Sequence, residues 1–199
     1  MSCFSGSAPI AKDVQAKFEA LTKSTIIEGF GMSETSPVTH VNPLYGTRKI
    51  GSIGIPVSCT DSKIVDAEDD SKELGVGEEG ELLVRGPQVM QGYWNREEES
   101  AEVLAGGWMH TGDLAVMDEA GYVSIVGRNK DMIIRGGENV YPREIEEFLF
   151  GHPAVADVQV VGIPDERYGE EIVAWVKCHP GHEASDEQLR FSGPAAALR

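Results

Sequence analysis

The sequence has few cysteines and no long apolar run, and each shortage argues against a class of protein. Its three cysteines are isolated, form no CxxC pair and are odd in number: Cys3, Cys59 and Cys178. This pattern argues against a disulfide framework and a thiolate metal site, and it fits a reducing cytoplasm. No apolar stretch approaches the roughly 18 residues that a membrane span needs. The first residues also lack the basic and apolar regions of a signal peptide.

Positive charge is scarce as well. Lysine and arginine number 17 against 33 aspartates and glutamates, so the formal net charge is -16 over 199 residues. Such a charge repels a phosphate backbone, which argues against nucleic acid as a partner. A bound nucleotide would need a divalent cation, backbone N–H groups or a well-placed arginine. The acidic run at residues 66–80 lacks the alternating ligands of a calcium loop, and we interpret it as a solvated loop.

The spacing of apolar residues predicts an α/β chain. Residues 10–22 have helical periodicity, which predicts an amphipathic helix whose buried stripe is Ile10, Val14, Phe18 and Leu21. The segment STIIEGFG then predicts a short strand. Residues 45–128 contain short runs of Ile, Val and Leu separated by Gly, Pro and acidic turns, which predicts a barrel-like subdomain or a distorted sheet.

Two local signals lie inside this β-rich region. Asn95 and Glu98 have the spacing of a capping box, which predicts the start of a short helix. Residues 114–127 have apolar runs on both sides of a turn at Asp118 to Gly121, which predicts a hairpin.

The pattern changes after Arg128. Pro142 occupies the expected first position of a helix, and two apolar strands follow at residues 154–162 and 170–178. We therefore expect a first domain over residues 1–128 and a small α+β domain over residues 129–199.

Four segments carry residues suited to nucleotide chemistry: SGSAPI, GFGMSETSP, GELLVRGPQVMQGYWN, and the stretch from GWMHTGDL to YPREIE. In GFGMSETSP the glycines let backbone N–H groups approach a phosphate, and Glu34 is a hard oxygen ligand suited to Mg²⁺. Asp113 could accept hydrogen bonds from ribose hydroxyls. Taken singly, GFGMSETSP and Asp113 are more simply interpreted as turns beside strands, and SGSAPI as an ordinary helix N-terminus with Pro9 near the first turn.

Taken together, these segments closely resemble the adenylate-forming superfamily of acyl-CoA synthetases, luciferases and peptide-synthetase adenylation domains. The resemblance runs from about residue 5 to about residue 178. It implies the tail of a large N-terminal domain, including its β-rich barrel-like subdomain, followed by a small mobile domain. It also implies that a carboxylic acid, a fatty acid by the wording of GMSETSP and GGENVYPREIEE, is activated with ATP to an acyl-adenylate and passed to CoA.

The resemblance assigns a nucleotide site to this chain. The backbone around Ser7, Ala8 and Pro9 would contact the adenine ring, and Phe30 would lie against it. Ser33 would bond the α-phosphate or the acyl carboxylate, and Glu34 would hold the magnesium. Asp113 and Arg128 would contact the ribose. The resemblance places three further residues at the same site: Gly31, Met32 and Ile125.

The resemblance also assigns a CoA-facing loop. Lys130 would be the hinge of the small domain, since the two half-reactions need different groups around one adenylate. Gly136 and Gly137 would leave room for the pantetheine arm, with Glu138 beside them. These glycines also suit a simple turn between a strand and a helix, and the two interpretations are compatible.

Two departures from the family predict that this chain alone is inactive. The sequence contains no Ser/Thr/Gly-rich phosphate loop ending in lysine, and no lysine follows Lys177. Without a cation at the reacting phosphate, adenylation should be very slow. Residues 191–199, FSGPAAALR, do not resemble the family's ending.

Three hypotheses remain open: a fragment of a fatty-acid–CoA ligase, a non-catalytic nucleotide-binding or interaction module, and an adenylation domain that loads a carrier protein. Because the large domain implied by the resemblance is absent from this sequence, we also expect an exposed apolar patch and self-association.

Overall fold

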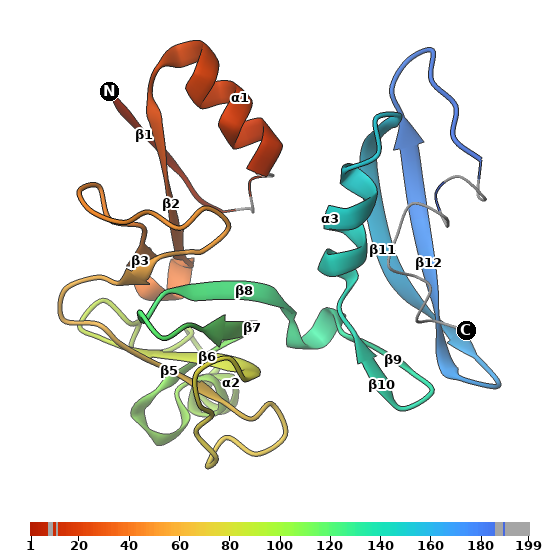
Figure 1. Ribbon diagram of the computed structural model, residues 1–199. Helices are drawn as coiled ribbons and strands as arrows, with labels where there is room; N and C mark the ends of the chain where they lie inside the picture. Colours follow the sequence, from red (N-terminus) through yellow and green to blue (C-terminus); the bar gives the residue numbers. More distant parts are fainter. Residues whose placement is uncertain (8–9, 11, 186–188, 190–199) are drawn as a thin grey trace. The chain divides into compact units, whose positions relative to one another are not determined.

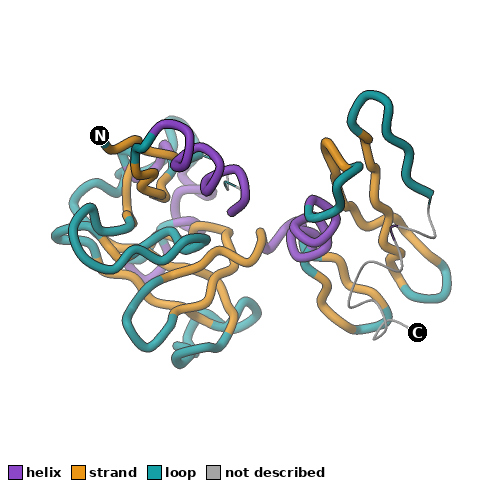
Figure 2. Tube along the Cα trace, turned by 45° about the horizontal axis from the view of Figure 1, so that its top comes forward, coloured by secondary structure: helices purple, strands orange, loops and turns teal. Residues whose placement is uncertain are grey.

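The computed structural model describes residues 1–7, 10, 12–185 and 189 (Figure 1). The chain divides into two compact units, Met1–Asn129 and Lys130–Arg199. Strands predominate in both units (Figure 2). Within the described residues, no helix has the length and apolar character needed to cross a membrane.

The first unit begins with a parallel strand–helix–strand motif. It consists of β1 (Ser2–Ser5), α1 (Lys12–Thr22) and β2 (Thr25–Gly31), and β1 pairs in parallel with β2. Two antiparallel strands, β3 (Val38–Val41) and β4 (Ile55–Pro56), complete a four-stranded sheet of order β1-β2-β3-β4. The strand expected in STIIEGFG is therefore confirmed.

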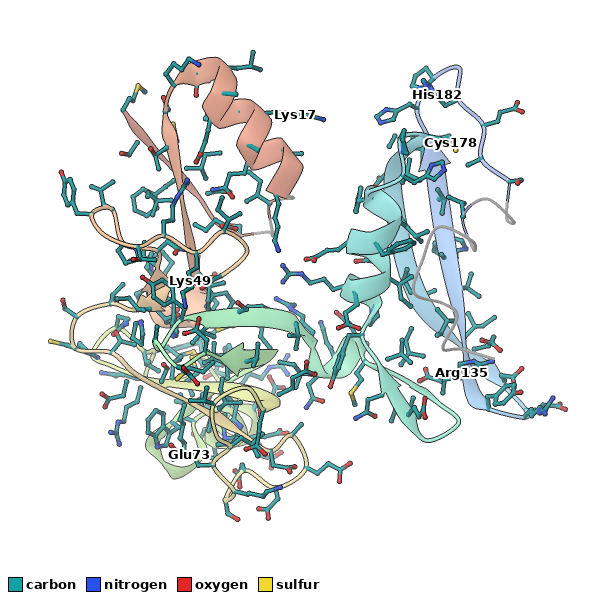
Figure 3. The ribbon with its side chains drawn as sticks, viewed as in Figure 1. Lys17, Lys49, Glu73, Arg135, Cys178 and His182 are labelled. Carbon is teal, nitrogen blue, oxygen red and sulfur yellow. The ribbon has the colours of Figure 1, made fainter. Side chains whose placement is uncertain are left out.

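The helix α1 forms where it was expected, but the expected buried stripe is wrong. Val14, Phe18 and Leu21 are exposed by 55%, 38% and 84%. The side facing β2 instead carries Gln15, which is fully buried and donates to the Ile26 carbonyl oxygen at 3.4 Å, and Glu19, which accepts the Ile26 N–H at 2.8 Å. The polar side of α1 therefore faces β2, because its side chains form hydrogen bonds with the strand backbone. Lys17 points away from the sheet (Figure 3).

The second sheet of this unit is an antiparallel meander. Its strands, in the order β5-β6-β7-β8, are β5 (Asp61–Val65), β6 (Glu79–Arg85), β7 (Met109–Met117) and β8 (Val123–Arg128). Its core contains Ile64, Leu82, Val84, Met109, Ala115 and Val123. The hairpin predicted at residues 114–127 is confirmed by the pairing of β7 with β8.

Of the two alternatives expected for this region, the structure shows a distorted sheet and not a barrel, because within the described residues the β5-β6-β7-β8 sheet is open and has register shifts. The free edge of β8 bonds to the segment before β4 rather than to β5. The Ile53 N–H donates to the Val123 carbonyl oxygen, and the Val123 N–H donates to the Gly54 carbonyl oxygen, both at 2.9 Å. A Cβ at Gly54 would overlap the backbone of Val41, so glycine is required where this segment passes close to β3. At Val123, the edge of β8 is therefore bridged to this segment and not to β5.

A short helical segment lies between β6 and β7. It comprises α2 (Glu97–Val103) and the 3₁₀ turn η2 (Ala105–Gly107). The expected capping box is wrong: the residue preceding the helix is Arg96, without a capping side-chain bond, and Asn95 has a left-handed φ of 54°. Asn95 is used in the turn that leads into the helix and is not its cap.

The second unit is a sheet covered by one helix. After the 3₁₀ turn η3 (Asn129–Asp131), the sheet runs β10-β9-β12-β11, with β9 (Ile133–Arg135), β10 (Glu138–Val140), β11 (Val155–Asp165) and β12 (Gly169–Cys178). The helix α3 (Pro142–Phe150) begins at Pro142 as predicted, and its Leu149 packs with Ile133, Val155, Val158 and Val160.

A buried histidine links the two sheets of the first unit. His40 on β3 is fully buried, and its ring nitrogens lie 3.0 Å from Thr39 Oγ1 and 3.2 Å from Ser62 Oγ on β5. Burial lowers the pKa of His40 from 6.5 to about 4. The unfolded chain therefore takes up a proton near pH 6.5 that the folded unit takes up only near pH 4, so stability falls as the pH drops through this window.

We predict that His40→Gln reduces this pH dependence. Between about pH 7 and about pH 5, the native protein should lose about 2 kcal/mol of unfolding free energy through His40, whereas the variant should not. Urea unfolding followed by circular dichroism measures this difference, and His182→Gln, at an exposed histidine, is the control. Equal pH dependence in His40→Gln and the native chain would contradict the assignment.

Candidate functional site

The first unit contains a cavity of about 710 Å³ where segments distant in the sequence meet. Met32 and Glu34 reach it from the connection between β2 and β3, Tyr93 from the loop after β6, and residues 109–112 from the start of β7. Carboxylates dominate the lining: Glu34, Glu68, Asp69, Asp70, Glu81 and Glu102. Three of the four segments singled out from the sequence therefore contribute to one cavity.

The charge of this cavity restricts what it can bind. Six carboxylates line it, and no lysine or arginine does so among the residues that the structure describes. A bare polyphosphate would be repelled here, whereas a phosphate carried with a divalent cation would not. Mg²⁺ commonly binds one or two carboxylates together with substrate phosphates, so the donor set fits that ion. In the described part of the chain, no group of three or more His, Cys, Asp or Glu side chains is arranged to hold a metal ion.

A tight turn positions Glu34. It lies in the 3₁₀ turn η1 (Ser33–Thr35), where the Thr35 hydroxyl accepts the Met32 N–H at 3.1 Å and also donates to the Pro37 carbonyl oxygen. A Cβ at Gly31 would overlap Pro37, so the turn requires glycine there. Ser33 is exposed on this turn.

Phe30 precedes the turn at the end of β2. It packs partly buried against the core of the second sheet, and its ring lies edge-on to His40 with centroids 6.4 Å apart. Phe30, the side chain expected to contact adenine, is therefore held in place by its contact with the buried His40.

Tyr93 contacts Glu34 directly, a pairing that was not predicted from the sequence. The Tyr93 hydroxyl donates to Glu34 Oε1 at 2.9 Å, and the Met90 N–H in the same loop donates to the Glu34 carbonyl oxygen at 2.7 Å. Burial, and then the hydrogen bond to Glu34, raises the pKa of Tyr93. The GYWN segment was part of the resemblance, but a contact across 59 residues leaves no local signal in the sequence.

The HTGD turn at the start of β7 is fixed by β6. Glu81 is buried; its Oε1 accepts the Gly112 N–H at 2.9 Å, and its Oε2 lies 3.1 Å from His110 Nδ1. The Thr111 hydroxyl donates to the Leu82 carbonyl oxygen at 2.7 Å and accepts the Asp113 N–H at 3.1 Å. Gly112 has a φ of 69°, which favours glycine.

Asp113 and Arg128 face each other across β7 and β8. Arg128 Nε donates to Asp113 Oδ1 at 3.1 Å, and the two side chains are exposed by 54% and 5%, respectively. A buried carboxylate beside a half-exposed guanidinium supplies both acceptors and donors, which suits a sugar diol. Ile125 lies on the same strand as Arg128 and packs against the core beneath it.

The remaining predicted residues lie elsewhere. Ser7 has a left-handed φ of 69°, and Ala8 and Pro9 lie outside the described residues. Lys130 is the first residue of the second unit. Gly136 and Gly137 form the turn before Glu138 with φ values of 63° and 88°. A Cβ at Gly137 would meet nothing within 4 Å, so its backbone conformation, and not lack of space in this unit, requires glycine there.

Comparison with known families identifies both parts of the chain. Residues 1–94 match the family model described as AMP-binding enzyme, and residues 144–191 match the AMP-binding enzyme C-terminal domain. The long-chain-fatty-acid–CoA ligase of Bacillus subtilis (strain 168) is 48% identical over 188 residues, which cover 94% of this chain and 33% of that protein. The chain thus spans about a third of the length of the curated relatives that it matches.

Solved structures agree with these matches. ATP-bound MatB from Rhodopseudomonas palustris superposes with a TM-score of 0.90 at 37% identity, covering 95% of this chain and 37% of that chain. The o-succinylbenzoate CoA synthetase from Bacillus subtilis, in complex with the acyl-adenylate intermediate OSB-AMP, gives 0.85 at 32% identity, covering 96% and 38%. The described fold corresponds to the C-terminal part of adenylate-forming enzymes, and the chain belongs to the AMP-binding enzyme family of acyl-CoA ligases.

Proposed function

We propose that this chain carries part of the nucleotide site and the small mobile domain of a fatty-acid–CoA ligase. The parent reaction joins a fatty acid to ATP as an acyl-adenylate with release of pyrophosphate, and then transfers the acyl group to the thiol of CoA. The observation that carries the proposal is the Asp113–Arg128 pair on the hairpin whose HTGD turn borders the Glu34 cavity. Identity of 48% to a long-chain-fatty-acid–CoA ligase supports the substrate class.

The first unit would bind the nucleotide. Asp113 accepts hydrogen bonds from the ribose hydroxyls, Arg128 donates to the ribose, and Phe30 lies against the adenine together with the backbone of residues 7–9. Ser33, exposed on its turn, donates to the α-phosphate or the acyl carboxylate. Glu34 would hold Mg²⁺, which neutralises phosphate charge in a cavity lined by carboxylates.

The second unit would serve the thioester step. In this proposal residues 129–199 form the mobile domain, Lys130 is its hinge, and the loop of Gly136, Gly137 and Glu138 faces the pantetheine arm of CoA. Two left-handed glycines in succession give that turn a narrow profile, because no side chain projects from its tip. A narrow turn suits the passage of a thin, flexible substrate arm.

A second candidate function is a nucleotide-binding module without catalysis. It is favoured by the lining of the cavity, where the described residues include no lysine or arginine to stabilise charge on a reacting phosphate. The two candidates share the nucleotide site and differ in whether a reaction follows binding.

We predict that Asp113→Asn weakens binding of AMP and of a non-hydrolysable acyl-adenylate analogue by about 10- to 100-fold, because a charged acceptor is worth about 1.5 to 3 kcal/mol. Calorimetric titration measures the change. Asp118→Asn, in the turn of the same hairpin, is the matched control and should bind as the native chain does. Equal affinity in both variants would refute the ribose role of Asp113. No detectable binding to the native chain would show that the part of the nucleotide site present in this chain does not bind AMP alone.

We predict that the chain alone forms no acyl-CoA. Incubated with ATP, Mg²⁺, a long-chain fatty acid and CoA, it should release no pyrophosphate above the uncatalysed rate, since its sequence has no glycine-rich phosphate loop ending in lysine. A full-length ligase of the family provides the positive control. Turnover by the chain would overturn the prediction and remove the second candidate.

We also predict self-association through the apolar surface of α1. Val14, Phe18 and Leu21 form an exposed stripe, and Phe4 on β1 is 73% exposed. The net charge of -16 opposes association at long range, so added salt should strengthen it. Sedimentation velocity should show a concentration-dependent shift that Leu21→Ser diminishes, with Val76→Ser on an exposed loop as control. A monomer at all concentrations and salt levels would count against this surface.

A further inference from the structure

We propose that Tyr93 is a positioning residue, whose phenol holds the Glu34 carboxylate in the orientation that binds Mg²⁺ with the nucleotide. The inference rests on the proposed function, and it assigns a role to a residue outside the predicted site. Its structural basis is the 2.9 Å hydrogen bond from the Tyr93 hydroxyl to Glu34 Oε1 inside the cavity.

Glu34 needs such a partner to keep one orientation. Within the described residues, Tyr93 is the only side chain that bonds its carboxylate. A glutamate side chain has three rotatable bonds, and ordering one costs free energy that a contact must offset. The other carboxylates lining the cavity, Glu68 and Glu102 among them, would repel Glu34 and favour rotamers directed to solvent.

Tyr93 is itself held rigidly. Its N–H donates to Ser100 Oγ in α2 at 2.8 Å, and its carbonyl oxygen accepts the Arg96 N–H at 3.2 Å. A Cβ at Gly92 would come within 3.0 Å of Ser100 Oγ, so the glycine permits this close approach. The same loop reaches the Glu34 backbone through Met90, so it fixes Glu34 at both its main chain and its side chain.

The chemistry of the contact suits a metal-binding carboxylate. The Tyr93 hydroxyl has one proton to donate, and in this structure it donates it to a carboxylate oxygen of Glu34. The bond engages Oε1, and Oε2 is left to meet a cation. Phenylalanine at this position would preserve the packing of the ring and remove only the donor.

The first test compares ATP binding with and without Mg²⁺ by calorimetry. In Tyr93→Phe the gain in ATP affinity that Mg²⁺ produces should fall about 10- to 100-fold, the loss of one hydrogen bond to a charged group, while binding without Mg²⁺ stays unchanged. Tyr45→Phe, which removes a hydroxyl from a side chain that is 89% exposed, is the matched control. In a Glu34→Gln background the Tyr93 change should have no further effect.

A second measurement does not depend on nucleotide binding. NMR relaxation of the Glu34 side chain in protein labelled with ¹³C-glutamate should report an ordered carboxylate arm in the native chain and in Tyr45→Phe, and a disordered one in Tyr93→Phe. Unchanged order in Tyr93→Phe overturns the inference, whatever the titrations show. Lost order with an unchanged Mg²⁺ effect overturns the link to the metal. Failure of the native chain to bind ATP counts against the proposed function, and the relaxation data then decide the positioning role alone.

Discussion

The hydrogen bonds between Val123 and the Ile53–Gly54 segment are the constraint on which the first unit depends. They join the edge of the β5–β8 meander to the sheet formed by β1 to β4. The buried Ser52 hydroxyl donates to the same Val123 carbonyl oxygen at 2.7 Å, and Asn42 donates to the Ser52 carbonyl oxygen at 2.6 Å. We call these hydrogen bonds between the two sheets the seam. Because β2 leads into Glu34 and β8 ends at Arg128, the seam holds the two halves of the candidate nucleotide site together.

The candidate site contains two regions that differ in charge: the Asp113–Arg128 ion pair and the carboxylate-lined cavity around Glu34. The Asp113–Arg128 pair is compact and mutually compensated, so it can meet neutral hydroxyls without a large change in local charge. The cavity around Glu34 is uncompensated among the described residues, so a phosphate can approach it only with a counter-ion. In the proposed function, one nucleotide would therefore meet two environments, and the metal would be needed at only one of them.

The sequence predicted those features that have a local cause. The hairpin at residues 114–127 and the start of α3 at Pro142 follow from turn chemistry and from the fixed φ of proline. The helix α1 was predicted, but not its orientation, because Gln15 and Glu19 form hydrogen bonds to β2 that periodicity does not reveal. The open sheet and the Tyr93–Glu34 contact depend on pairings between residues far apart in the chain, for which local patterns carry no information.

The same seam has a consequence for the order in which the chain folds. Closing it joins Gly54 to Val123 across about 70 residues, and the entropy of closing so long a loop must be lost before any contact compensates for it. In the second unit, β11 and β12 form a hairpin across a turn at residues 166–168, with one register shift between Val155 and Asp157, so its largest pairing is local. The second unit, which is synthesised later, thus has the more local main pairing, and it can reach its native fold while the first unit is still assembling.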